Sequence, residues 1–279
     1  MSISFKKVLI ISKKDNKAAT NLAIQQSNWF RERGIESFIG TISNLEQEVA
    51  DFKPELALVL GGDGTVLYVA RKLIKQNLYF LGVNFGRVGF LAEIHPDKWE
   101  DLFEEIFLKN SFSVSERLAI KCKVYRSNWV FFSGHSVNDV VICREGLARL
   151  LDITLFIGEN EEALNIRADG IIVSTPNGST GYCVGAGGSL IFPELNVLEI
   201  CPICPFLSLI KPMIVASDRV IEIELNGSVQ DATLTIDGQE GFKLQKKDRV
   251  VITKSPYSLK FITPYRSSYI KKLKQKGYV

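Results

Sequence analysis

Residues 61–65 hold the most chemically suggestive pattern in this chain. They read Gly-Gly-Asp-Gly-Thr and follow the apolar run 56–60. Beyond them, from Val66 to Ile74, apolar residues recur at the i, i+3, i+4, i+7 spacing of a helix. The pattern predicts a buried strand, a glycine turn and a helix. In such a unit, glycine N–H groups and the helix N-terminus can bind a phosphate.

Asp63 is the unusual member of this turn. A carboxylate repels phosphate, so its presence indicates a bridging cation or a proton acceptor beside the phosphate. The alternative is an ordinary turn in which Asp63 caps the following helix. No glycine in the chain is followed by lysine, and the turn carries no G-x-G-x-x-G. A P-loop NTPase, a protein kinase and a standard dinucleotide fingerprint are therefore disfavoured.

A second polar segment runs from Asp169 to Tyr182. An apolar strand leads from Asp169-Gly170 into the run 174–180, Ser-Thr-Pro-Asn-Gly-Ser-Thr. Hydroxyl groups and backbone donors in such a turn suit ribose hydroxyls and phosphates, and Tyr182 is placed to stack on a base. The alternative is a polar hairpin loop with Tyr182 packed in a core.

Two further polar sites occur in the second half of the chain, one inside an apolar strand and one directly after a strand. Asn138 and Asp139 lie within the run 137–142. Neighbouring strand residues point to opposite faces, so one of the two side chains faces the core unless it reaches a ligand or an internal partner. A capped strand end is the structural alternative. Asp237-Gly238-Gln239 by itself predicts only a hairpin turn.

Composition limits the class of protein. A chain of 279 residues holds one large domain or two ordinary ones. Its 46% apolar and 23% charged residues are typical of a soluble globular protein, and its net charge of +3 does not argue for a nucleic-acid partner. No apolar run reaches the roughly 18 residues of a membrane span, and the polar stretch 12–15 does not suit a signal peptide. We expect a cytoplasmic protein.

The cysteines predict no disulfide framework. There are five, scattered, which fits reduced thiols. Cys201 and Cys204 have the Cys-x-x-Cys spacing of a redox or zinc site, but their flanks are apolar and the chain has only two histidines. Buried, inert cysteines are the favoured interpretation.

The order of patterns predicts two kinds of domain. Up to about residue 110, strands at 8–11, 37–41, 56–60 and 79–84 alternate with helices at 16–33, 44–51, 65–76 and 97–109, which indicates an open parallel α/β sheet. From 111 onward, helices are expected only at 180–186 and 267–276. Short apolar strands are expected at 118–125, 129–133, 137–143, 151–157, 171–174, 212–216, 220–226, 233–237, 249–254 and 258–262. This part predicts a β-sandwich-like domain.

Taken together and in this order, the motifs resemble those of the NAD kinase family, over roughly residues 5–265. The Gly-Gly-Asp-Gly-Thr turn alone is shared with diacylglycerol kinases and phosphofructokinases. The segment from Asp169 to Tyr182 is the one that discriminates.

The resemblance implies an α/β domain over 1–110 for the phosphate donor, joined by the tail 265–279, and a β domain over 111–264 for the dinucleotide, with the active site in the cleft between them. It implies transfer of the terminal phosphoryl of ATP, another nucleoside triphosphate or polyphosphate to the adenosine-ribose 2′-hydroxyl of NAD, giving NADP. A divalent cation, with Mg²⁺ the first choice, and a homodimer or homotetramer in the cytoplasm are also implied.

The resemblance further assigns roles to residues. Asp63 is implied as the essential carboxylate, as base, cation holder or both. Donor phosphates are implied at Gly61, Gly62, Gly64 and Thr65. For NAD, Asn138 and Asp139 match the pair that holds the nicotinamide-side ribose, Ser174, Thr180 and Tyr182 fall in the adenosine segment, and the remaining implied contacts are Arg167, Asp169 and Asp237.

Several residues depart from the family pattern. Asp139 stands where Glu is usual, Asn177 for Thr, Gly181 for Ala, Ser189 for Pro and Phe206 for His. None removes a charge from the implied centre, so they bear on substrate affinity rather than on reaction class. Two rival functions stay open on the residues: a lipid or sphingoid-base kinase that shares the glycine turn, and a dinucleotide-binding regulator without catalysis. A nicotinamide-dependent oxidoreductase is disfavoured, because no G-x-G-x-x-G follows the first strand.

Overall fold

The computed structural model describes residues 4–12, 16–86, 89–145, 150–159, 162–206, 210–226, 232–264 and 268–279. The chain forms two compact units. Unit 1 comprises Met1–Glu116 with Leu259–Val279, and unit 2 comprises Arg117–Ser258. Each unit is described by itself.

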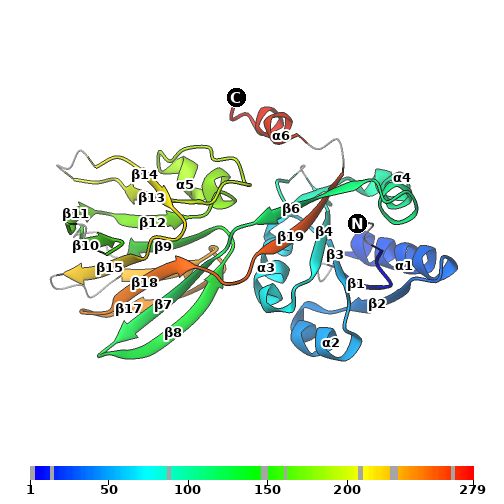
Figure 1. The fold of residues 1–279 in the computed structure, drawn as a ribbon, viewed down its shortest axis with the longest axis horizontal. Coiled ribbons are helices and arrows are strands. Elements are labelled where there is room, and N and C mark those ends of the chain that lie inside the picture. Colours follow the sequence, from blue (N-terminus) through cyan, green and yellow to red (C-terminus); the bar gives the residue numbers. More distant parts are fainter. Residues whose placement is uncertain are drawn as a thin grey trace. The chain divides into compact units, whose positions relative to one another are not determined.

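Unit 1 contains one seven-stranded sheet that is flanked by helices (Figure 1). The strand order is β2 (Glu36–Gly40), β1 (Lys7–Ser12), β3 (Leu56–Leu60), β4 (Tyr79–Val83), β19 (Leu259–Pro264) and β6 (Phe112–Arg117), with β5 (Ala92–Ile94) also paired to β4. The pairings of β1 to β5, and that of β19 with β4, are parallel. The predicted open parallel α/β sheet is confirmed.

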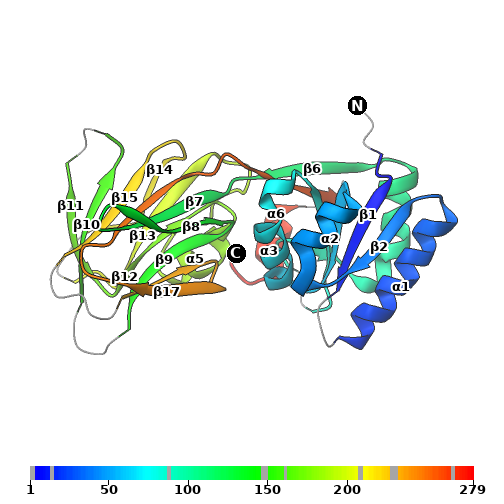
Figure 2. The ribbon, with the colours of Figure 1, turned by 90° about the horizontal axis from the view of Figure 1, so that it is seen from below.

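Right-handed crossovers put the helices on both faces of this sheet. α1 (Lys17–Glu32) connects β1 to β2. α2 (Leu45–Phe52) connects β2 to β3 and α3 (Asp63–Lys72) connects β3 to β4, so these two connections cross the sheet in the opposite direction and their helices share the other face. α2 and α3 are neighbours (Figure 2). Asn16 caps α1 by accepting from the Ala19 N–H, and Gly34 follows its end with a φ of 71°. Between α3 and β4 lies a short turn, η2 (Ile74–Gln76).

The predicted helix over 97–109 is a succession of three helical geometries. A 3₁₀ turn, η3 (Pro96–Lys98), leads into α4 (Trp99–Phe103) and then into a π turn, η4 (Glu104–Leu108). Phe103 and Phe107 pack on Phe30 of α1, with ring centroids 5.2 and 4.9 Å away. The last helix, α6 (Tyr269–Gln275), belongs to unit 1 and pairs its buried Lys272 with Glu93.

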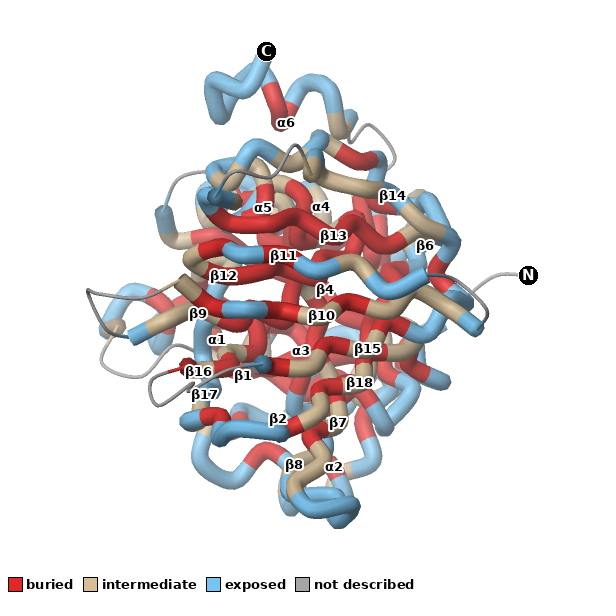
Figure 3. Tube along the Cα trace, turned by 90° about the vertical axis from the view of Figure 1, so that its left-hand side faces the viewer, coloured by how far each residue is buried: buried red, intermediate tan, exposed pale blue. Residues whose placement is uncertain are grey.

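Unit 2 consists of two six-stranded sheets. One has the order β11 (Leu164–Ala168), β10 (Leu151–Ile157), β15 (Ile221–Asn226), β18 (Arg249–Lys254), β7 (Ile120–Arg126), β8 (Trp129–Ser136). The other has β14 (Met213–Ala216), β13 (Val197–Ile203), β12 (Gly170–Ser174), β9 (Asp139–Arg144), β16 (Ala232–Ile236), β17 (Glu240–Leu244). Apolar residues of both sheets form one core, so the sandwich-like fold is confirmed. Figure 3 shows β12 and β13 buried along most of their length.

Six strands differ from the sequence prediction: β5, β6, β11, β13 and β17 lie where no strand was predicted, and β19 lies in another sheet than expected. The predicted strand 258–262 is β19, and it pairs in parallel with β4 of unit 1 rather than with the antiparallel strands that precede it. β13 contains Pro202 as its next-to-last residue, a type that usually argues against a strand, and Pro202 lies opposite Ile171 of β12. None of the helices in the described ranges is long and apolar enough to cross a bilayer.

Candidate active site

Asp63 is the first residue of α3, and Gly62 is its N-cap. The alternative in which Asp63 caps the helix is therefore wrong. Its carboxylate instead accepts three backbone N–H groups from a distant segment: Phe90 at 2.7 Å, Leu91 at 3.0 Å and Ala92 at 2.9 Å. These bonds join the start of α3 to the start of β5 and fix the carboxylate in position.

Gly89 completes this binding of the carboxylate. A Cβ at Gly89 would lie 1.8 Å from Oδ1 of Asp63, so only glycine allows the chain to approach so closely. The N–H of Gly89 also donates to the Ala92 carbonyl at 3.2 Å, which closes a turn around the carboxylate. No local sequence pattern links this partner segment to Asp63.

The glycine turn itself offers fewer donors than its sequence indicates. The Gly61 N–H donates to the Val83 carbonyl, and the Thr65 N–H donates to the Gly62 carbonyl, both at 2.9 Å. In the described part of the chain, the N–H groups of Gly62 and Asp63 have no acceptor. They lie at the positive end of α3, where an anion is favoured.

In unit 2, Asp237 holds the backbone of Asn138 and Asp139. Its carboxylate accepts the Ser136 hydroxyl at 2.6 Å and the N–H groups of Val137 and Asn138 at 3.1 and 2.7 Å. Asp237 lies in the β16–β17 turn, where it and Gly238 have φ values of 53° and 61°. The predicted hairpin is confirmed. The Asp237 carboxylate is buried and positions Asn138 through the backbone.

Among the carboxylates of this region, Asp139 has the pKa furthest from its ordinary value. It is 6% exposed, and its pKa is raised to about 7, first by burial and second by the charge of Asp237. Among the described residues, no group donates a hydrogen bond to its carboxylate. A buried acid without a donor, in a polar cluster, is typical of a functional residue.

The run 174–180 lies against Asn138. The Asn177 side-chain amide donates to Oδ1 of Asn138 at 2.6 Å, and the Thr175 N–H donates to the Asn138 carbonyl at 2.8 Å. A Cβ at Gly178 would lie 2.3 Å from that carbonyl, which explains the glycine. Asn177, where Thr is usual in the family, thus orients the Asn138 side chain.

Most hydroxyl groups of this run do not face outward. Those of Ser174, Thr175 and Ser179 are buried and donate to the carbonyls of Thr175, Val137 and Pro176, respectively. They build the turn. Thr180 is half-buried.

Asp169 lies at the far end of β12 from Ser174, about 17 Å away at the usual rise of a strand. Its carboxylate accepts Nε of Arg144 at 2.5 Å, a partner that the sequence analysis missed. Tyr182, the first residue of α5 (Tyr182–Gly185), is 51% exposed. The alternative in which Tyr182 is packed in the core is wrong.

Arg167 is separate from these groups. It lies on β11, in the other sheet, where it pairs with the exposed Asp152 at 3.3 Å. Its guanidinium is 5.9 Å from the ring centroid of Phe206. The structure thus brings together Asn138, Asp139, the run 174–180 and Asp237. Asp169 lies at the other end of β12, and Tyr182 lies in α5.

The backbone N–H of Ser189, which stands where proline is usual in the family, makes a hydrogen bond. The fully buried Glu199 of β13 accepts the Ser189 N–H at 2.6 Å and the Cys183 thiol at 3.2 Å. Proline, usual in the family at this position, has no N–H to donate. Cys201 is buried as predicted, but Cys204 is exposed, and both are free thiols. Among the described residues, no group of three or more His, Cys, Asp and Glu is arranged to hold a metal ion.

Two family models match this chain: the ATP-NAD kinase N-terminal domain over residues 13–110 and the ATP-NAD kinase C-terminal domain over 137–264. The chain belongs to the NAD kinase family. Relatives include the NAD kinase of Nitratidesulfovibrio vulgaris, 40% identical over 281 residues, which are 100% of this chain and 99% of the relative. The NAD kinase of Oleidesulfovibrio alaskensis is also 40% identical, over 100% of this chain and 95% of its own length.

Solved structures of this family have the same fold. The yeast NADH kinase complexed with NADH matches with a TM-score of 0.82 at 22% identity, covering 98% of this chain and 87% of its own. An NAD kinase from Archaeoglobus fulgidus in complex with ATP matches with a TM-score of 0.77 at 24% identity, covering 96% and 99%. NAD kinase family membership and fold class, as the sequence predicted, are confirmed.

Proposed function

We propose that this chain is an NAD kinase, which transfers the terminal phosphoryl of ATP to the 2′-hydroxyl of the adenosine ribose of NAD and releases NADP. One observation of unit 1 supports it most. The Asp63 carboxylate, held by three backbone N–H groups, lies at the start of a helix where the N–H groups of Gly62 and Asp63 have no acceptor among the described residues. This pairs a phosphate site with a proton acceptor.

Phosphoryl transfer depends on positioning and on charge stabilisation more than on covalent chemistry. The N–H groups of Gly62 and Asp63 and the dipole of α3 hold the donor phosphates. The Asp63 carboxylate accepts the proton of the attacking hydroxyl, a role that contributes about 10²–10⁴ in rate. Its bonds to residues 90–92 keep it in place, which a proton acceptor requires.

The dinucleotide lies, in this proposal, along β9 and β12 of unit 2. Asn138 and Asp139 take the ribose at one end, and Tyr182 and Asp169 take the other nucleoside. The separation of about 17 Å between Asp169 and Ser174 suits a ligand with two nucleosides better than a mononucleotide. Asp237, Asn177 and the buried hydroxyls of the 174–180 run position these residues.

A divalent cation fits this site only as a companion of the donor. The described residues offer no protein cage for a metal. Mg²⁺ commonly binds through one or two carboxylates and the substrate phosphates, so Asp63 is the residue that would meet it. When bound, the cation neutralises charge on the phosphates. A homo-oligomer, a cytoplasmic location and the use of other donors stay predictions.

The test is a coupled assay of purified protein with NAD, ATP and Mg²⁺, in which an NADP-specific dehydrogenase reports the product. We expect NADP from NAD and no product from 2′-deoxy-NAD. Equal turnover of the deoxy analogue would place the acceptor hydroxyl elsewhere. Phosphorylation of a lipid acceptor in place of NAD would favour the lipid-kinase rival, and tight NAD binding without any product would favour the regulator.

A further inference from the structure

The last helix of the chain, α6, has no role in the proposal above. Two of its lysines, Lys271 and Lys274, are exposed, whereas Lys272 is buried. The Lys272 ammonium pairs with the Glu93 carboxylate of β5, and the two side chains are 11% and 9% exposed. Lysine is almost never buried unless it is paired, so this ion pair marks a specific contact between α6 and β5.

This contact lies next to the groups that hold Asp63. Glu93 directly follows the three residues whose backbone N–H groups donate to the Asp63 carboxylate. Phe90, the first of these three, also meets the end of the chain. Its ring centroid is 5.9 Å from that of Tyr269 in α6 and 6.2 Å from that of Tyr278 just beyond the helix. The C-terminal tail therefore contacts the segment that holds the carboxylate at both of its ends.

The sheet supports this segment, residues 90–93, only over a short length. β5 is three residues long and pairs with β4 at a register that shifts between Gly82 and Val83. A strand of three residues is at the lower limit of strand lengths and forms few ladder hydrogen bonds. The contacts with α6 thus add a constraint on the backbone that carries the donors to Asp63.

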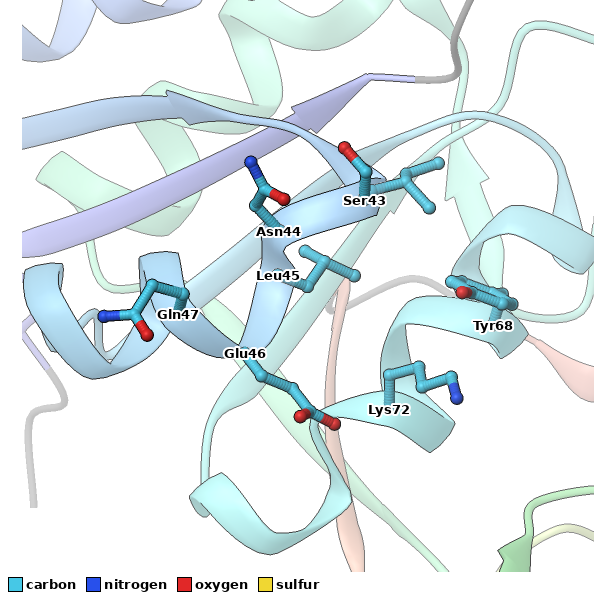
Figure 4. A pocket seen from close by; sticks show the side chains of 8 residues that line it. Ser43, Asn44, Leu45, Glu46, Gln47, Tyr68 and Lys72 are labelled. Carbon is cyan, nitrogen blue, oxygen red and sulfur yellow. The ribbon is translucent and has the colours of Figure 1, made fainter.

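α3 itself is less closely packed on the side of the segment 42–47. A pocket of about 440 Å³ lies between that segment and two residues of α3, Tyr68 and Lys72 (Figure 4). Contacts across such a space restrain a helix less than a filled interior does. This side of α3 therefore contributes less to the position of Asp63 than the segment 90–93, which binds the carboxylate directly.

We propose that α6 is a positioning element of the active site. Through the Lys272–Glu93 pair it holds the segment 90–93, and this segment holds the Asp63 carboxylate where it accepts the proton of the attacking hydroxyl. The inference rests on the proposed function and extends it to Lys272 and Glu93, which act through Asp63. Loss of the Lys272 charge leaves the Glu93 carboxylate buried without its partner, so the segment shifts toward water and draws its N–H groups away from Asp63.

The first test measures kcat for NADP formation by the full chain. Lys272→Met should lower kcat at least about tenfold, because a shift of about 1 Å in a reacting group can cost about 10² in rate. Lys272→Arg keeps the charge and should retain most of the rate. Lys274→Met, at an exposed lysine of the same helix, is the matched control and should leave kcat unchanged.

A double-mutant cycle shows whether Lys272 acts through Asp63. In the Asp63→Asn background, Lys272→Met should lower kcat by less than about twofold, because the group that Lys272 positions is already lost. A contribution that does not pass through Asp63 would lower kcat by the same factor in both backgrounds, and this result would overturn the proposal.

Glu93→Gln guards against misfolding of Lys272→Met. The amide leaves no buried carboxylate without a partner, and the Lys272 side chain can extend its ammonium to water from the surface helix. Glu93→Gln should lower kcat in the parent and have no further effect in the Asp63→Asn background. A parental kcat in Glu93→Gln and in folded Lys272→Met would contradict the assignment.

Hydrogen exchange tests the positioning without substrate. The amides of Phe90, Leu91 and Ala92 should exchange at least about tenfold faster in Lys272→Met than in the parent, and at the parental rate in Lys274→Met. Unchanged exchange in Lys272→Met would also overturn the proposal. Failure of the proposed function looks different, since the parent protein would then make no NADP while the exchange of these amides still responds to Lys272→Met.

Discussion

The two polar turns, residues 61–65 in unit 1 and 174–180 in unit 2, look alike in sequence but are held differently. In the first, the carboxylate of Asp63 is bound by N–H groups of residues 90–92, and the N–H groups of Gly62 and Asp63 have no acceptor in the described chain. In the second, the hydroxyls bond to carbonyls of the turn and of Val137, and Asn177 bonds Asn138.

The difference lies in which groups are left for a ligand. The first turn directs backbone donors outward because it opens a helix, whose first N–H groups have no intrahelical partner. The second uses its polar groups to support a neighbouring strand end, so its contribution to binding passes through Asn138 and Asp139. A glycine-rich or hydroxyl-rich sequence therefore does not by itself reveal which atoms face the ligand.

The largest effect is expected for Asp63→Asn. An amide neither carries the charge nor accepts a proton at neutral pH, so we expect kcat to fall by at least about 10² with little change in NAD affinity. Steady-state kinetics with varied NAD would measure both. Titration of Mg²⁺ shows whether Asp63 acts mainly as proton acceptor or mainly as cation ligand. If high metal restores the rate, Asp63 mainly holds the cation. Near-parental turnover would mean that the first turn is not the catalytic one.

The same variant tests the structural role of the carboxylate. The amide oxygen can replace one carboxylate oxygen toward residues 90–92, but its NH₂ group cannot accept. We expect a loss of about 1–3 kcal/mol in the free energy of unfolding, measured with urea. A loss near zero would show that the three bonds do not stabilise unit 1.

Gly178→Ala probes the packing of the second turn. The new Cβ would lie 2.3 Å from the Asn138 carbonyl oxygen, so the turn must move away from β9. We expect a loss of about 1–3 kcal/mol in the free energy of unfolding and a raised KM for NAD. Gly185→Ala, where a Cβ meets nothing within 4 Å, is the control. Equal stability of the two variants would contradict the close contact.

Asp139→Asn tests the buried carboxylate through the pH dependence of stability. Because the folded pKa of Asp139, about 7, exceeds the ordinary aspartate pKa of 3.8, the folded state binds more protons than the unfolded state between these pH values. Stability should therefore fall as pH rises from 4 to 7 in the parent protein, and this slope should disappear in the variant. Near pH 8 the variant should be more stable by about 1–2 kcal/mol, because removal of a buried charge outweighs an unpaired amide.

Urea midpoints measured from pH 4 to 8 would check this prediction. Asp152→Asn, at an exposed carboxylate on β10, provides the matched control and should keep the parental slope. The same slope in the Asp139 variant and in the parent would assign the titration to another group.

The smallest effect is expected for Tyr182→Ala. Since the ring is 51% exposed, its loss should weaken NAD binding by about 1 kcal/mol, the low end for base stacking, and leave the melting temperature unchanged. Calorimetric NAD titration with a thermal scan would measure both. A lowered melting temperature with intact NAD affinity would give Tyr182 a structural role despite its exposure.

Local patterns determined the element types and the family of this protein. The run 56–60 and the helical spacing after it specify β3 and α3, because alternation and helical period are properties of neighbouring residues. The signals at Asn16 and Gly34 fix the ends of α1, and Asp237-Gly238 fixes a hairpin. The order of the motifs identified the NAD kinase family.

Tertiary structure alone decided the partners. Asp63 meets residues 90–92, Asp237 meets residues 137–139, and Asp169 meets Arg144, each across a gap that no local pattern spans. β19 joins the sheet of unit 1, although its sequence resembles the antiparallel strands before it. Hydrogen bonding and burial depend on groups brought together by the whole fold, so the sequence could name the polar residues but not which of them were left for a ligand.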